Sequence, residues 1–126
     1  MSRLEVYPVT FKIEGVGEAE GELHRIKAPH TAEEIWYALP ISSRIRSQDN
    51  AHAYFQVNFQ VKAEKPTQDV KPGEICYAPM SKSVHIIYDD VRPYQEMNVV
   101  GNITKGLEIF KELKLSKLIV VEKREK

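Results

Sequence analysis

The feature that most constrains the fold is one long alternation of apolar and polar residues. Between residues 52 and 62, one face of the chain carries apolar side chains and the other carries polar side chains that are mostly uncharged. The apolar face consists of Ala53, Phe55, Val57, Phe59 and Val61. A period of two places successive side chains on opposite faces of a strand. The run therefore predicts one β-strand over residues 52–62, and its uncharged polar face is typical of a barrel wall.

The other segments predict short strands separated by turns. Residues 3–27 are expected to form a hairpin around Gly15 and Gly17, with a bulge or an edge position at Pro8, which cannot donate a ladder hydrogen bond. Further strands are expected over residues 75–78, 84–88, 98–103 and 118–122, with a loop over residues 63–74. Many short strands with few helices are typical of a mainly β, closed or nearly closed barrel.

Two helices are also expected. The first begins at Thr31, whose hydroxyl would form a capping box with Glu34, and it ends near Pro40. Its apolar side chains recur with helical spacing and form one stripe: Ala32, Ile35, Trp36 and Leu39. We therefore expect Trp36 to be largely buried. The second helix is expected near residues 105–114.

The charge balance limits the classes of partner. The chain has 18 Lys and Arg against 18 Asp and Glu, so its formal net charge is zero. A domain that depends on nucleic acid usually carries a basic excess, and no nucleic-acid partner is expected here. The single cysteine, Cys76, excludes an internal disulfide and cannot hold a structural zinc ion alone. The four histidines lack metal-ligand spacing, so we expect no metal and no cofactor.

The length of the chain and the shortness of its apolar runs predict a single cytoplasmic domain. A chain of 126 residues fits a single domain over residues 1–126, with a frayed tail at residues 123–126. Charged residues occupy the start of the chain, where a secretory signal has its apolar core. The longest apolar run, residues 118–121, is far shorter than the roughly 20 residues of a membrane span. We therefore expect no membrane partner.

Several motifs resemble those of a known family. Residues 28–36 (Ala-Pro-His-Thr-Ala-Glu-Glu-Ile-Trp) resemble the beginning of the first helix of cyclophilins, and residues 99–108 resemble their C-terminal strand-to-helix passage. A set of four further motifs is similar to short prokaryotic cyclophilin-like proteins: residues 38–40 (Ala-Leu-Pro), 54–55 (Tyr-Phe), 72–79 (Pro-Gly-Glu-Ile-Cys-Tyr-Ala-Pro) and 98–101 (Asn-Val-Val-Gly). This resemblance spans most of residues 29–113. It implies a closed eight-stranded barrel capped by two short helices, and it names no reaction.

The chain departs from cyclophilins where they catalyse prolyl isomerisation. Arg44 and Gln56 stand near the positions of the catalytic arginine and glutamine. Ser42 and Ala53 replace the aromatic residues beside them, and the glycines that follow the glutamine are absent. Isomerisation needs a cation near the prolyl nitrogen and an apolar pocket for the ring. We therefore expect negligible isomerase activity and assign no catalytic residue.

A binding site is predicted on the polar face of the long strand. Tyr54 and Gln56 offer uncharged hydrogen-bonding groups, and Arg44 supplies a nearby cation. We expect these three residues to line one concavity that binds a small molecule or an extended peptide without catalysis. Three alternatives stay open: the side chains only satisfy hydrogen bonds of the barrel, the protein is an isomerase-like enzyme, or it is a structural or interaction protein that acts as a homo-oligomer.

Overall fold

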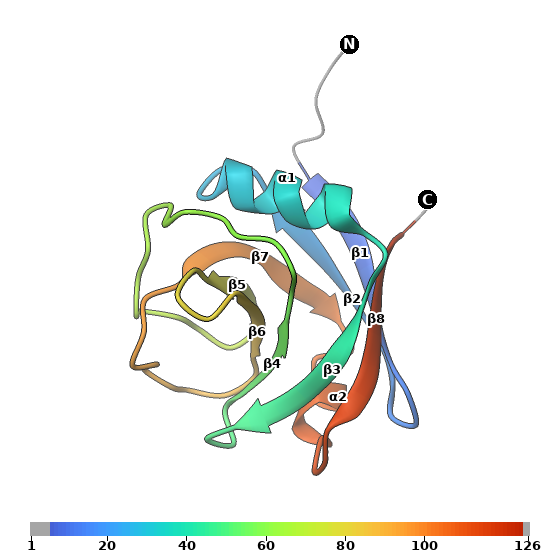
Figure 1. Ribbon diagram of the computed structural model, residues 1–126. Coiled ribbons are helices and arrows are strands. Elements are labelled where there is room, and N and C mark those ends of the chain that lie inside the picture. Colours follow the sequence, from blue (N-terminus) through green and yellow to red (C-terminus); the bar gives the residue numbers. More distant parts are fainter. Residues whose placement is uncertain (1–5, 125–126) are drawn as a thin grey trace.

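The computed structural model describes residues 6–124 of the 126-residue chain. Eight antiparallel strands close into a barrel in the order β1-β2-β7-β5-β6-β4-β3-β8 (Figure 1). The strands are β1 (Val6–Ile13), β2 (Gly17–His24), β3 (Ile41–Gln48), β4 (His52–Gln56), β5 (Glu74–Ala78), β6 (Ser83–Ile87), β7 (Asn98–Lys105) and β8 (Lys117–Lys123). Helix α1 (Pro29–Ala38) lies across one end of the barrel, and α2 (Glu108–Lys111) follows β7. The predicted fold class, a closed eight-stranded barrel with two short helices, is confirmed.

The first hairpin forms as predicted, but without a bulge at Pro8. β1 and β2 pair in one uninterrupted register from Val6 with His24 to Ile13 with Gly17. The buried face of β1 consists of Tyr7, Val9, Phe11 and Ile13, so the alternation keeps one parity throughout. The bulge was predicted because the amphipathic Tyr7 was counted with the polar face. Residues 3–5 of the predicted hairpin lie outside the described residues.

The first helix begins two residues earlier than predicted, and Thr31 is not its cap. Pro29 occupies the first turn, where its missing N–H costs no hydrogen bond, and Ala28 is an N-cap without a side-chain hydrogen bond. The carboxylate of Glu64 accepts hydrogen bonds from the backbone N–H groups of His30 (3.1 Å) and Thr31 (2.8 Å) instead. The helix terminus is therefore capped by a distant loop.

Trp36 is largely buried, as the apolar stripe predicts, although part of it stays in contact with solvent. Its side chain packs against the interior cluster and stacks on Tyr7, with ring centroids 5.1 Å apart. The ammonium group of Lys123 lies 4.7 Å from the centre of the Trp36 ring, on the open side of the helix. Trp36 therefore closes the end of the barrel instead of filling its core.

The strand predicted over residues 52–62 is shorter in the structure. Its ladder ends at Gln56, and the chain then bends at Asn58. The Val57 N–H donates to the Lys82 carbonyl (2.9 Å), which continues the contact with the β5–β6 turn by one residue after the pairing with β3 has ended. β3 itself was not predicted, because it carries only two apolar residues, Ile41 and Ile45.

The second helix is also shorter than predicted. β7 continues to Lys105, and Gly106 then adopts a φ of +87°. A Cβ atom at Gly106 would lie 2.7 Å from the Glu18 carbonyl oxygen, so this position needs glycine for both conformation and space. Only Glu108–Lys111 remain helical, in place of residues 105–114.

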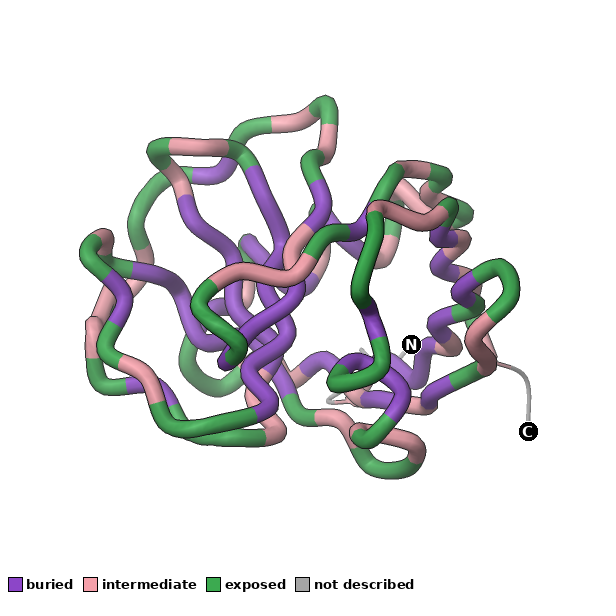
Figure 2. Tube along the Cα trace, turned by 90° about the horizontal axis from the view of Figure 1, so that it is seen from below, coloured by how far each residue is buried: buried purple, intermediate pink, exposed green. Residues whose placement is uncertain are grey.

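Two apolar clusters hold the barrel and its loops. The main cluster fills the interior and includes Phe11, Phe55, Tyr77 and Phe110. A second cluster lies on the outer face of β5 and β6 beneath the long loops, and its members are Val70, Cys76, Ala78, Ile87, Met97 and Val99. Figure 2 shows buried positions recurring within those loops. Cys76 is fully buried here, and burial raises the pKa of its thiol, so it serves as a small apolar side chain.

The C-terminal segment is more ordered than a frayed tail over residues 123–126. Lys123 is the last residue of β8, and the Arg124 N–H donates to the Pro8 carbonyl (3.0 Å). The Arg124 guanidinium also contacts Glu20 (3.2 Å). Residues 125 and 126 lie outside the described residues. Within residues 6–124, no helix has the length and apolar character needed to cross a membrane.

Candidate functional site

A hollow on the outer face of β3 and β4 brings the predicted site residues together. Its volume is about 450 Å³, within the range of ligand pockets. It is lined by Arg44, Tyr54 and Gln56, as the sequence led us to expect, and also by Ser43 and Arg46. Arg46 lies directly opposite Tyr54 in the β3–β4 ladder. We call these five residues the arginine hollow.

The arginine hollow is positively charged. The Arg44 guanidinium is held in place because its Nε donates to the Ser116 hydroxyl (2.9 Å) and its Nη2 to the Ser116 carbonyl (3.2 Å). Arg46 has neither an ion pair nor a hydrogen bond from its side chain within residues 6–124. The lining contains no carboxylate, so nothing in the hollow itself neutralises the two cations.

A second hollow continues from the first. It has a volume of about 370 Å³ and is lined by Ala38, Pro40, Ile41, Ser42, Gln56, Val57 and Asn58. Gln56 belongs to the lining of both hollows, so they adjoin along the outside of β3. We call the second hollow the slot. Together they run from the end of α1 to the middle of the β3–β4 ladder.

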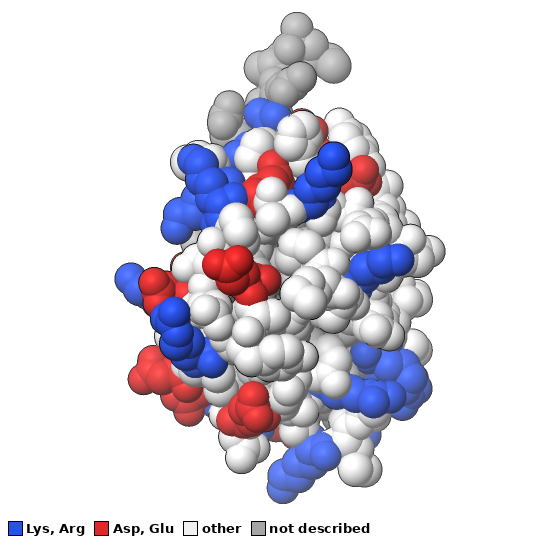
Figure 3. Space-filling model, turned by 60° about the vertical axis from the view of Figure 1, so that its left-hand side comes forward, with Lys and Arg blue, Asp and Glu red and all other residues white. Residues whose placement is uncertain are grey.

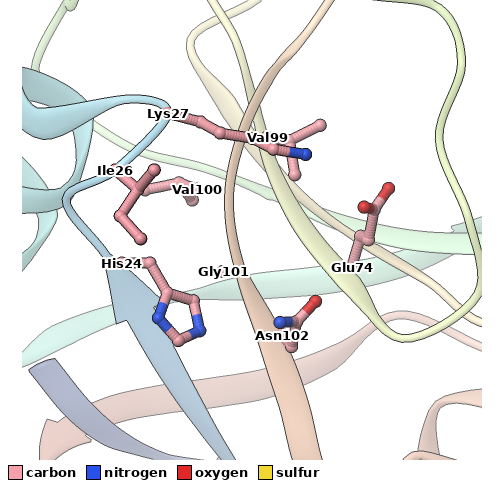
Figure 4. Close-up of a pocket in the computed structure, with 8 residues that line it drawn as sticks. All are labelled: His24, Ile26, Lys27, Glu74, Val99, Val100, Gly101 and Asn102. Atoms are coloured by element: carbon pink, nitrogen blue, oxygen red, sulfur yellow. The ribbon is translucent and has the colours of Figure 1, made fainter. Parts of the chain in front are cut away.

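Another depression, at β2 and β7, is a weaker candidate. Figure 4 shows its lining, which includes His24, Val99 and Asn102. Its volume of about 200 Å³ is below the range of roughly 300–1,000 Å³ that ligand pockets usually have. Its two charged residues, Lys27 and Glu74, have opposite signs, so the depression does not select one charge.

The loop side of the molecule has a different character. Seen from the loops that follow β4 and β6, the surface has a broad central area without Lys, Arg, Asp or Glu (Figure 3). Two large side chains are exposed near these loops: Tyr94 lies in the loop after β6, and Met80 lies in the β5–β6 turn. This area lacks the cations of the arginine hollow.

A pair of buried histidines lies directly beside the arginine hollow. His52 and His85 are each 3% exposed, and their Nδ1 atoms are 2.9 Å apart, with the rings stacked. The ring of Tyr54, which lines the hollow, stacks on the other side of His85 at 5.4 Å. His85 was expected to be a satisfied wall residue, and its hydrogen bonds agree with that prediction. The contact with His52 was not foreseen.

The histidine pair belongs to a chain of hydrogen bonds. The chain contains Gln95, Ser81, Ser83, His85 and His52. The Ser83 hydroxyl hydrogen-bonds to Nε2 of His85 (2.8 Å), and the Nδ1 atoms of the two histidines share one N–H. One imidazole therefore donates this proton, and the other accepts it at an unprotonated nitrogen and is neutral.

Burial keeps the two histidines neutral. Burial, and secondarily the charge that His52 could carry, lowers the pKa of His85 from its usual 6.5 to about 3. Burial also lowers the pKa of His52, and Asp49, whose Oδ2 lies 3.8 Å from Nε2, only partly opposes this. The other two histidines, His24 and His30, lie outside this chain. Within residues 6–124, no three His, Cys, Asp or Glu side chains converge to hold a metal ion.

Sequence reasoning missed Arg46 and Ser43. Both belong to β3, which the pattern did not predict, so their position beside Tyr54 could not be deduced. The histidine pair was missed because its members lie 33 residues apart. The contact between the two histidines follows once the pairing of β4 with β6 is known. In that register Tyr54 lies opposite His85, and His52 is the diagonal neighbour of His85 on the same face of the sheet.

Comparisons with known proteins agree on the fold. A family model described as cyclophilin-like matches residues 7–122. A hypothetical protein from Archaeoglobus fulgidus, solved in solution, is 28% identical over 98% of both chains, with a TM-score of 0.80. McbB, solved in complex with tryptophan, has a TM-score of 0.80 at 14% identity, over 94% of this chain and 45% of McbB.

A more distant structure extends the same likeness. A cyclophilin-type peptidyl-prolyl cis-trans isomerase from Cryptosporidium parvum has a TM-score of 0.67 at 10% identity, over 96% of this chain and 99% of its own. At these low identities, McbB and the isomerase show a common fold alone. None of the curated protein sequences matches this chain.

Proposed function

Because this chain belongs to the cyclophilin-like family and carries a positively charged hollow on the outer face of its barrel, we propose that it is a non-catalytic binding module. It binds a small molecule or an extended peptide that carries a carboxylate, and the arginine hollow is the binding site. The observation that carries this proposal is the pair of arginines, Arg44 and Arg46, in a lining without any acidic residue.

The chemistry of the lining fits a carboxylate. A guanidinium presents parallel N–H donors that match the two oxygens of a carboxylate, and such charged hydrogen bonds are stronger than neutral ones. Arg44 is already held by Ser116, so binding costs it less side-chain entropy. Tyr54 and Gln56 can donate to or accept from the amide groups next to the carboxylate. These neutral groups provide orientation, and the arginines provide charge selectivity.

The proposal is tested with probes that differ only in the carboxylate. We would titrate the protein, by calorimetry, with acetyl-Thr-Val-Thr-Val that ends in a free carboxylate and with the same peptide ending in an amide. Free tryptophan is a third probe, since McbB was solved with this amino acid. The free acid should bind at least about tenfold more tightly than the amide, because hydrogen bonds to charged groups contribute about 1.5–3 kcal/mol.

Matched arginine variants locate the site. Arg46→Gln should weaken the free acid about tenfold and leave the amide unchanged. Arg92→Gln is the control, because Arg92 is an exposed arginine that pairs with Asp69 on another loop, and it removes the same net charge. Equal affinity for acid and amide would refute carboxylate recognition. Equal losses in both variants would show that net charge alone attracts the probe.

A further inference from the structure

One segment of β3 has a neighbouring strand on only one side. Residues Ile41–Ile45 pair with β8, whereas only Ile45–Gln48 pair with β4. Among the described strands, none forms backbone pairs with Ile41–Ser43 on the β4 side, where the Ser43 hydroxyl donates to the Gln56 carbonyl (2.8 Å). In Figure 1, β3 and β4 meet near their connecting turn and diverge towards α1. This short stretch is an open strand edge. Other staggered strand ends, such as Gly17–Ala19 of β2, also pair on one side only, but this edge has the slot beside it.

The chain after β4 is fixed in its diverging position. The Val57 N–H donates to the Lys82 carbonyl (2.9 Å), and the Val61 N–H donates to the Tyr77 hydroxyl (3.1 Å). The chain also bends at Asn58. Closing the gap would require these hydrogen bonds to break, so the slot is a built feature of the fold. The open edge and the lining of the slot share Ile41 and Ser42.

We propose that the slot binds an extended peptide segment as an added strand along Ile41–Ser43. This inference rests on the proposed function, because the peptide's terminal carboxylate is the group held by the arginine hollow. Backbone N–H and C=O groups on an open edge recognise another extended backbone whatever its sequence. The neighbouring arginines select the end of the chain that carries the negative charge.

The geometry fixes the direction and the length of the bound segment. β3 runs from Ile41 towards Arg44 and Arg46, and the slot meets the arginine hollow at Gln56. A C-terminal carboxylate at the arginines therefore requires a peptide that runs parallel to β3. Three strand residues span about 10 Å, so the last three or four residues of the peptide are recognised.

The slot also limits the class of partner. Ile41 and Val57 are half-buried and offer apolar contact to every second side chain, whereas Ser42 and Asn58 are exposed and suit polar ones. Pro40, directly before the edge, cannot donate a ladder hydrogen bond, and β3 pairs with β4 from Ile45 onwards. Such a short edge admits the end of a peptide better than a long strand from a second copy.

Backbone methylation of the peptide tests strand addition. The probes are acetyl-Thr-Val-Thr-Val with a free carboxylate and the same peptide with its two central amide nitrogens methylated. Methylation removes the N–H donors and keeps the carboxylate. We expect about tenfold weaker binding of the methylated peptide. We also expect NMR amide exchange to slow for at least one of residues 41–43 when the unmodified peptide binds, and not when the methylated one does.

The outcomes separate this inference from the proposed function. If the free acid binds more tightly than the amide but methylation does not change the affinity, the carboxylate site is supported and strand addition is wrong. Free tryptophan that binds as tightly as the tetrapeptide would also overturn strand addition alone. If neither peptide binds, both are overturned. The amides of residues 41–43 could also become protected from exchange without peptide, as the protein concentration rises. That result would assign the edge to a second copy of the chain and overturn the inference.

Discussion

Acidification should destabilise this protein before its carboxyl groups titrate, because of the buried histidine pair. Burial lowers the pKa of His85 from 6.5 to about 3 and also lowers that of His52. In the unfolded chain both histidines titrate near 6.5. Between these limits the unfolded state binds more protons than the folded state. Their contribution to stability is therefore complete above about pH 6.5 and is lost as the pH falls towards 3.

The size of the effect follows from the shift at His85. One extra proton in the unfolded state changes the free energy of unfolding by about 1.4 kcal/mol per pH unit. Between pH 6.5 and pH 5, His85 alone therefore removes about 2 kcal/mol, and His52 adds to this in the same direction. In model peptides, aspartate and glutamate side chains titrate near pH 4, below this interval. The histidine pair should dominate the slope there.

Urea unfolding at several pH values between 5 and 7 measures this slope. His85→Gln should lower it by up to about 1.4 kcal/mol per pH unit near pH 5 and by about half as much near pH 6.5, whatever its effect on stability at neutral pH. His30→Gln is the control, because His30 is exposed and lies outside the hydrogen-bonded chain. A flat free energy of unfolding between pH 7 and 5 would refute the reasoning. A slope unchanged by His85→Gln would also refute it.

Three further outcomes are expected. The protein should not measurably accelerate cis–trans exchange in a proline peptide, because the arginine hollow lacks an apolar pocket for the ring; acceleration that Arg44→Ala abolishes would contradict this. Trp36→Ala should lower the free energy of unfolding by about 2 kcal/mol, below the 3–5 kcal/mol of a fully buried aromatic, since part of the side chain stays in contact with solvent. Glu64→Ala should cost about 1–2 kcal/mol in urea unfolding by uncapping α1, and a loss under 0.5 kcal/mol would show that water replaces the cap.

The barrel could be predicted because its strands alternate and its motifs resemble a known family. The alternation over residues 52–62 identified an inward face correctly, and Ala53, Phe55 and Val61 are all buried. The failures occurred where long-range contacts override a local pattern. The run over residues 52–62 alternates to its end, yet the chain bends at Asn58, and the Val61 N–H then donates to the Tyr77 hydroxyl instead of to a neighbouring strand. No local pattern could show that bond.

The candidate site was predictable only in part, for a related reason. Tyr54 and Gln56 belong to a clear strand, so their shared face followed from the period of two. β3 lacks that signal because serine and arginine fill most of its positions, and it is a strand only through its pairing with β4 and β8. Arg46 could be placed only once that register was known. The Glu64 cap was likewise invisible, since it joins residues 33 positions apart.

Tyr54 lines the arginine hollow and also stacks on His85. Variants at this residue must therefore separate its contact with a ligand from its contact with the histidine pair. Tyr54→Ala removes the ring that stacks on His85 and should destabilise the fold, whatever it does to a ligand. Tyr54→Phe keeps the ring and removes only the hydroxyl, which has no hydrogen bond within residues 6–124. We therefore expect Tyr54→Phe to retain the stability and pH slope of the wild type while weakening acetyl-Thr-Val-Thr-Val a few-fold in calorimetry. Unchanged affinity would show that the hydroxyl makes no contact with the peptide, and an altered pH slope would show that it supports the histidine pair.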